Sequence, residues 1–213
     1  MVLTPSETAL TPENFRQIFF TTRQRDGKVI FVTDITRCLR RAYYSYFNPQ
    51  PSSPQAVVGQ LLHRAFASTL RDKIGAYFEV GFTIGLGKDW VLKGRCDMLF
   101  ADSVYEFKFV RSIPRAKERE GYNLQVQLYC HAFRARKGYL VFVDRETFDI
   151  EIVEVELRDG VAESLLDDAR YLADCLEKGI PPERVSPRFA GECEYCEFVE
   201  VCGMGEDVRE VKV

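Results

Sequence analysis

Three ionisable residues between positions 90 and 110 have the types and spacing of a metal-dependent hydrolytic site. Asp97 precedes the motif Glu106-Phe107-Lys108, in which Glu106 and Lys108 share one face of an extended strand. Two carboxylates a few ångströms apart raise each other's pKa unless a cation lies between them. A hard divalent ion such as Mg²⁺ or Mn²⁺ binds such oxygens, and the Phe107 carbonyl would add another ligand. Lys108 would orient a water molecule or neutralise charge that develops on a phosphate.

The alternative interpretation is an exposed strand face on which these charges only form salt bridges, with Glu106 paired to Lys108 or Lys93. Short charge patterns of this kind are common and are usually solvated. His63 favours the metal site, because it is one of only two histidines and lies in a helical segment before the strands. We assign no role to the other histidine, His131.

Gln125 and Tyr129 form a third polar group, downstream of the strands. Residues four positions apart share one face of a helix, so this pair would present an amide and a phenol together. We expect that face to contact a scissile phosphate or an adjacent base. A mixed polar patch over the core is the alternative.

Four of the seven cysteines are candidates for a metal clip. Cys193, Cys196 and Cys202 lie close together near the end of the chain, a spacing typical of metal ligands in a reducing compartment. Three thiolates are an incomplete set, and Cys38 is the best candidate for the fourth. The other three cysteines are expected to be buried thiols within core elements: Cys96, Cys130 and Cys175. Four thiolates suit zinc or an iron–sulfur cluster equally well by count.

The elements that must position these residues follow from hydrophobic periodicity. Segment 90–110 reads as two strands joined by a turn at Ala101-Asp102-Ser103. Its aromatic residues Tyr105, Phe107 and Phe109 alternate with Glu106 and Lys108, so we expect them to face a core. Further helices are expected over residues 11–22, 35–47, 55–74, 121–136 and 160–178, and further strands over 77–84, 138–143 and 147–157.

Composition limits the class of protein. The chain has 213 residues, of which 46% are hydrophobic, and a net charge of −3. This size and apolar content predict one globular domain, and the charge means that a nucleic-acid partner would need a local basic groove. The N-terminal residues lack the basic and apolar regions of a signal peptide, and no apolar stretch is long enough for a membrane span. We therefore expect a cytoplasmic protein with no membrane partner.

Taken in order, these motifs resemble the RecB-like branch of the PD-(D/E)XK nuclease superfamily. The order is a helix histidine (His63), an aspartate after a glycine-containing strand (Asp97), the E-x-K motif and then Q-x-x-x-Y. One early cysteine and a C-terminal C-x2-C-x5-C flank this core. That arrangement is similar to the CRISPR-associated Cas-four family, a set of stand-alone RecB-like exonucleases. The resemblance covers roughly residues 28–205.

The resemblance implies an α/β fold, with a restriction-endonuclease-like core in which helices flank a mixed central sheet. It implies a single domain over residues 1–213, with the nuclease core at 28–182 and a cysteine clip at 183–205. It favours an iron–sulfur cluster, 4Fe–4S or 2Fe–2S, on Cys38, Cys193, Cys196 and Cys202. It also implies that His63, Asp97, Glu106 and the Phe107 carbonyl hold Mg²⁺ or Mn²⁺, with Lys108, Gln125 and Tyr129 as further catalytic residues.

The function implied is a DNA exonuclease that degrades single-stranded DNA from 5′ to 3′ and trims prespacers beside the CRISPR integrase. Two alternatives remain: a repair and recombination nuclease of the RecB or AddB type, and a non-catalytic iron–sulfur or zinc DNA-binding protein. Basic residues around the site segments would form the DNA groove: Arg37, Arg40, Arg41, Arg64, Arg111, Arg115, Lys117, Arg119, Arg134 and Arg136. Tyr43, Tyr44, Tyr46 and Tyr122 are candidates for stacking on bases.

Overall fold

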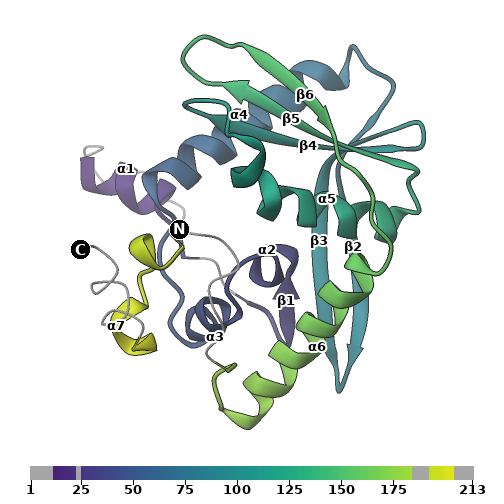
Figure 1. The fold of residues 1–213 in the computed structure, drawn as a ribbon. Helices are drawn as coiled ribbons and strands as arrows, with labels where there is room; N and C mark the ends of the chain where they lie inside the picture. The colour runs from purple at the N-terminus through teal and green to yellow at the C-terminus, as the bar shows by residue number, and fades with distance from the viewer. Residues whose placement is uncertain (1–11, 23–24, 184–191, 204–213) are drawn as a thin grey trace, which may run out of the picture.

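A mixed sheet forms the centre of the molecule (Figure 1). The computed structural model describes residues 12–22, 25–183 and 192–203. The strands are β1 (Val29–Phe31), β2 (Tyr77–Gly87), β3 (Trp90–Phe100), β4 (Ser103–Val110), β5 (Lys137–Asp144) and β6 (Ile150–Glu154). Their order across the sheet is β1-β3-β4-β5-β6, and β2 also pairs with β3. The β1–β3 and β4–β5 pairs are parallel and the others are antiparallel. The mixed α/β architecture expected from the motifs is confirmed.

The predicted hairpin at 90–110 is present as β3 and β4, joined at Ala101 and Asp102. Only the end of β3 pairs with β4, at Met98, Leu99 and Phe100. Earlier in β3, Val91, Leu92 and Lys93 pair with β1, while β2 runs along the other edge. The middle of β3 therefore lies where the strand leaves β1 and joins β4, and Asp97 is in this transition.

Two hydrophobic clusters fix the helices to the sheet. On one face, α5 (Glu120–Phe133) and α6 (Val161–Lys178) bury Leu128 and Leu172 against strand residues such as Leu140 and Phe142. On the other face, α4 (Pro54–Arg71) contributes Phe66 and Leu70 to a smaller cluster with Phe107. Figure 1 shows this layered arrangement. The polar residues of β4 thus face α5, and its aromatic residues face α4, as expected.

One predicted helix is divided in two. Residues 35–47 were expected to form a single helix carrying Cys38, but the chain forms α2 (Val32–Ile35), then a break, then α3 (Leu39–Phe47). Cys38 has an extended backbone (φ −63°, ψ 119°) as the N-cap of α3. The Cys38 N–H donates a hydrogen bond to Glu192 Oε1 at 3.0 Å instead of to a backbone carbonyl within a helix. A residue far along the chain therefore stabilises the break.

The remaining elements match the expectations with shifted ends. Helix α1 (Pro12–Phe19) is shorter than predicted, β2 is longer, and β6 covers only part of 147–157. A single-turn helix η1 (Ala116–Arg119) precedes α5, while η2 (Glu192–Tyr195) and α7 (Val199–Cys202) follow α6. In the described part of the chain, no helix combines the length and the apolar character needed to cross a membrane.

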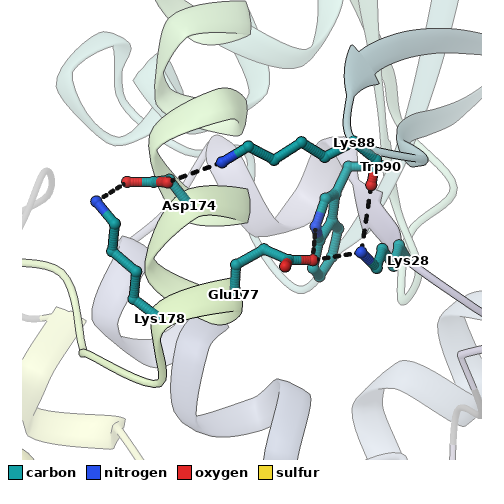
Figure 2. Close-up of polar contacts among 6 residues, drawn as sticks. All are labelled: Lys28, Lys88, Trp90, Asp174, Glu177 and Lys178. Atoms are coloured by element: carbon teal, nitrogen blue, oxygen red, sulfur yellow. Dashed lines mark hydrogen bonds and ion pairs between the residues drawn. The ribbon is translucent and has the colours of Figure 1, made fainter.

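A polar network ties α6 to the start of the sheet (Figure 2). Glu177 Oε1 accepts a hydrogen bond from the Trp90 indole at 2.8 Å and lies 2.5 Å from Lys28 Nζ. One turn earlier, Asp174 pairs with Lys88 at 3.5 Å and with Lys178. The last turns of α6 are therefore fixed to residues that precede β1 and begin β3.

Candidate active site

Asp97, Glu106 and Lys108 converge at the junction of β3 and β4. Asp97 Oδ2 accepts the backbone N–H of Phe107 at 2.7 Å, which fixes the aspartate against the next strand. Glu79 lies on β2 between the pairs Phe78–Met98 and Val80–Cys96, and its backbone is left-handed with φ of +56°. Left-handed backbone at a residue other than glycine is strained, and such strain is often found at functional sites.

His63 joins the group from α4, on the other face of the sheet. Its Nδ1 lies 3.2 Å from Asp97 Oδ1. The imidazole packs edge-on against Phe109, with ring centroids 5.0 Å apart. One turn later, Phe66 packs edge-on against both Phe107 and Phe109. The aromatic face of β4 therefore positions the histidine, and the polar face of the same strand carries Glu106 and Lys108.

Lys108 occupies the centre of the site, on the α5 side. Its Nζ donates to Glu106 Oε1 and to Gln125 Oε1, both at 2.8 Å. It also lies 4.8 Å from the centroid of the Tyr122 ring. Two hydrogen bonds and a cation–π contact restrict the ammonium group to one position.

The carboxylates have opposite pKa shifts. Burial raises the pKa of Glu106 to about 7, the negative charge of Asp97 adds to this, and Lys108 opposes it. Burial also raises the pKa of Asp97, but the hydrogen bond and charge of His63, together with Lys108, lower it below its ordinary value. Glu106 does pair with Lys108, as the salt-bridge alternative expected, but it is only 6% exposed, so this is not a solvated strand face.

One oxygen of this site lacks a partner. Glu106 Oε2 is buried and has no hydrogen-bond partner in the described part of the chain. Buried polar atoms are rarely left unpaired, and a bound ion is one recognised explanation for such an atom. In the described ranges no three His, Cys, Asp or Glu side chains are arranged to hold a metal as they stand. At this site His63 is bonded to Asp97, and Glu106 is bonded to Lys108. The donors fit a hard divalent ion, and binding it would require these pairs to open.

Gln125 and Tyr129 lie beneath the site rather than on its surface. They are 6% and 4% exposed, so direct contact with DNA, as expected from the sequence, does not fit the structure. Gln125 accepts a hydrogen bond from Lys108, and the Tyr129 ring packs edge-on against Phe82. Burial raises the Tyr129 pKa well above its ordinary value, with Glu106 and Asp97 adding to the shift.

Several expected DNA-contacting residues have other roles. Tyr43 is buried, so it is not available to stack on a base. Arg119 donates to the Pro114 carbonyl and pairs with Glu151 at 3.0 Å. Tyr122 packs beneath Lys108, a role that its position one turn before Gln125 could have indicated. The Lys117 side chain lies outside the described part of the chain.

The four cysteines expected to form a clip line one pocket. Cys38, Cys193, Cys196 and Cys202 surround it with Tyr44, Phe198 and Val199. Burial raises the pKa of the Cys193 thiol, and the other three thiols raise it further because they lie close by. The expected buried thiols are confirmed, with Cys96, Cys130 and Cys175 at most 6% exposed. The four thiols are not arranged as a ready-made metal site in the described residues, but together around one pocket they are the donor set of a tetrathiolate metal group.

A family model for the PD-(D/E)XK nuclease superfamily matches residues 66–203, which include Asp97, Glu106, Lys108 and three of the pocket cysteines. A relative described as CRISPR-associated exonuclease Cas4, from Saccharolobus solfataricus, is 30% identical over 192 residues. The match covers 84% of this chain and 89% of that protein. This chain belongs to the Cas4 family of PD-(D/E)XK nucleases. It is therefore a nuclease, and the nucleases of this superfamily use divalent metals.

Solved structures agree with the Cas4 assignment. The crystal structure of SSO0001 is 28% identical and superposes with a TM-score of 0.63, covering 84% of this chain and 88% of that one. An alkaline exonuclease from Laribacter hongkongensis has a TM-score of 0.51 at 13% identity, over 71% of this chain and 89% of that one. At that identity the second match supports the fold alone.

Proposed function

We propose that this Cas4-family chain is a divalent-metal-dependent exonuclease that hydrolyses single-stranded DNA from 5′ to 3′. The observation that carries the proposal is the convergence of His63, Asp97, Glu106 and Lys108 around a buried carboxylate oxygen that has no partner among the described residues. Asp97, Glu106, His63 and the Phe107 carbonyl would hold Mg²⁺ or Mn²⁺. When bound, the ion supplies a Lewis acid for the phosphate.

The protein's own groups perform the remaining tasks. Lys108 is held in position by Glu106 and Gln125, so it can orient the attacking water or neutralise charge that develops on the phosphate. Gln125 and Tyr122 keep the ammonium in place from the α5 side. Asp97 is fixed by the Phe107 N–H and by His63, which limits its freedom before substrate binds.

The four-cysteine pocket is proposed to hold an iron–sulfur cluster, either 4Fe–4S or 2Fe–2S. Its support is the convergence of four thiols from opposite ends of the chain, together with the resemblance to the Cas-four family. The cluster would join the N-terminal part of residues 28–182 to the clip at 183–205. Thiolates alone do not distinguish iron–sulfur from zinc, so the absorbance spectrum of the purified protein decides between them.

We further propose that this nuclease acts in CRISPR adaptation, trimming prespacers beside the integrase complex. The support is the relative from Saccharolobus solfataricus, which is described as CRISPR-associated. A pull-down with the integrase would test the partner separately from the chemistry.

End-labelled single-stranded DNA tests the activity and its direction. With Mn²⁺ present, a 5′-labelled strand should release its label in very short products early, while a 3′-labelled strand should shorten progressively. With EDTA both strands should stay intact. Early release of the 3′ label would show that cleavage runs from 3′ to 5′ and contradict the proposed direction. No cleavage with any divalent metal would refute the proposal that the protein hydrolyses single-stranded DNA.

A further inference from the structure

Arg40 has an unusual position for an arginine in this molecule, because its guanidinium reaches three separate parts of the chain. Its Nε donates to Cys202 Sγ at 3.2 Å, one terminal nitrogen donates to the Pro182 carbonyl at 2.5 Å, and the other donates to the Tyr44 hydroxyl at 3.0 Å. The guanidinium also lies 5.7 Å from the Tyr44 ring centroid. The side chain thus connects α3 to the chain after α6 and to a cysteine of the pocket.

The next residue on α3 provides a contrast. Arg41 donates to both carboxylate oxygens of Glu197 at 3.1 Å, in an exposed bidentate pair. Arg41 also lines the cysteine pocket, but none of its described hydrogen bonds reaches a sulfur atom. Of the two adjacent arginines, Arg40 is therefore the one that directs a positive N–H at a cysteine.

Glu192 brings the opposite charge to the same pocket. Its Oε1 accepts the Cys38 N–H at 3.0 Å, which fixes the break between α2 and α3. Its Oε2 is buried and has no hydrogen-bond partner in the described part of the chain. Both Glu192 and the four cysteines line the pocket, so the carboxylate charge lies beside the sulfur atoms.

Hydrogen bonds to sulfur and nearby charge are two of the main controls on the reduction potential of an iron–sulfur cluster. A cationic N–H on a ligand sulfur stabilises the reduced, more negative cluster, and a buried carboxylate destabilises it. We propose that Arg40 and Glu192 are paired positioning residues that shift the potential of the cluster in opposite directions. This inference rests on the proposed iron–sulfur cofactor.

The test is an anaerobic redox titration of the purified holoprotein, in which the solution potential is read at an electrode through mediator dyes and the cluster is followed by absorbance. Dithionite is the reductant, and it is oxidised as the cluster takes up one electron. The potential at which half of the cluster is reduced is its midpoint. Arg40→Gln removes the charge and the sulfur-directed donor, and we expect a more negative midpoint. Glu192→Gln keeps a carbonyl oxygen for the Cys38 N–H but removes the charge, and we expect a more positive midpoint.

Two further variants distinguish a change in the cluster's midpoint potential from a general disturbance of the fold. Arg170→Gln removes an arginine from an exposed ion pair with Asp167 on α6 and should leave the midpoint unchanged. Arg40→Lys keeps the charge but cannot reach three acceptors, so its midpoint should lie between those of the wild type and Arg40→Gln. If Arg40→Gln retains no cluster, the midpoints of Arg40→Lys and Glu192→Gln are compared with that of the wild type instead.

Unchanged midpoints in Glu192→Gln and in the Arg40 variants that retain the cluster would overturn the inference. Shifts of the same sign for both positions would also overturn it, because general loosening of the pocket has no reason to distinguish the two charges. A wild-type protein without iron–sulfur absorbance would refute the cofactor assignment itself, and with it this inference, before any variant is compared.

Discussion

Glu106 is buried with one oxygen bonded to Lys108 and the other without a described partner. A fully hydrogen-bonded carboxylate would be more stable in such a position, because an unpaired buried acceptor costs about 1–3 kcal/mol. The high pKa of Glu106, about 7, is the direct result of this burial. Functional sites commonly keep such unfavourable arrangements, and here the free oxygen is what a metal ion would bind.

Two buried glutamines on α5 allow a matched test of the site. Gln125 accepts from Lys108, while Gln127 bonds the Glu156 carbonyl and the Arg158 N–H on the far side of the helix. Gln125→Leu should lower the cleavage rate about 10- to 100-fold, the range expected for losing a hydrogen bond to a charged group. Gln127→Leu should instead lower the free energy of unfolding by about 1–3 kcal/mol and leave the rate of the folded enzyme unchanged.

Single-turnover rates and denaturant melts distinguish the two outcomes. A Gln125→Leu enzyme with the wild-type rate would show that Lys108 does not depend on this contact.

At the residue scale, the sequence indicated the chemical types correctly but not their exposure. His63, Asp97, Glu106 and Lys108 could be recognised from the sequence, because the first three are metal-ligating types and a lysine can orient water or neutralise phosphate charge. The burial of Gln125 and Tyr129 was not readable, since a spacing of four defines a shared helix face without saying what covers it. Arg40 was assigned to DNA for the same reason: its charge was visible, and its three acceptors were not.

The contact between α5 and β5 sets the position of Gln125 relative to Lys108. A Cβ atom added to Gly138 would lie 2.2 Å from Val126 Cγ1 and 2.8 Å from Cys130 Sγ, so the helix packs directly onto the strand backbone. The absence of a side chain at this one position allows the close approach.

Gly138→Ala should therefore push α5 outward. We expect the free energy of unfolding to fall by about 1–3 kcal/mol, as for other overpacked cores, together with a lower cleavage rate. Gly59→Ala is the matched control, because its Cβ would meet nothing within 4 Å and it lies inside α4. That control should raise stability by about 0.5–1 kcal/mol. Equal stabilities of the two variants would contradict the packing argument.

The network at the end of α6 predicts a pH dependence. Hydrogen bonds from Lys28 and Trp90 lower the Glu177 pKa below its ordinary value. A carboxyl with a lowered folded-state pKa stabilises the fold above its unfolded pKa, about 4.3, and this contribution is lost as the pH falls through the folded value. Glu177→Gln should thus be less stable than the wild type at pH 7, and the difference should shrink as the pH falls below the unfolded pKa and through the lowered folded value.

Trp90 provides the signal, because it is the chain's single tryptophan and its indole donates to Glu177. Unfolding followed by tryptophan fluorescence at several pH values measures the difference. A stability difference that persists unchanged at low pH would exclude the ion pair as its cause.

At the element scale, hydrophobic periodicity indicated most helices and strands, and long amphipathic helices such as α6 were the clearest. The break at 36–38 could not be predicted, because it depends on Glu192, more than half the chain away. The change of pairing partner along β3, from β1 to β4, also could not be predicted. A strand that changes its partner midway has the same alternation of apolar and polar residues as a strand that keeps one partner.

At the scale of the whole molecule, two segments far apart in the sequence, around Cys38 and around Cys193–Cys202, line the cysteine pocket. Figure 1 shows α7 beside α3, and Phe198 packs against Tyr44 with ring centroids 5.9 Å apart. A cluster joining Cys38 to Cys193 would close a loop containing most of the chain. Closing so long a loop lowers the conformational entropy of the unfolded chain. By analogy with a disulfide, this would stabilise the folded state by about 5 kcal/mol.

Cys38→Ala should therefore abolish the iron–sulfur absorbance and lower the free energy of unfolding by up to about 5 kcal/mol. Cys130→Ala removes a buried thiol of α5 outside the pocket and should keep the wild-type iron content. Iron analysis and denaturant melts measure both. Wild-type iron content in Cys38→Ala would contradict the four-cysteine site.

The central claim is that Asp97 and Lys108 belong to a metal-dependent nuclease site. The most direct measurement is Mn²⁺-dependent cleavage of single-stranded DNA by the wild type, Asp97→Ala and Lys108→Ala. We expect both variants to cleave about 10²- to 10³-fold more slowly or not detectably, because each removes a charge that acts at the phosphate. Their cluster absorbance should match that of the wild type. Full activity in both variants would contradict the account.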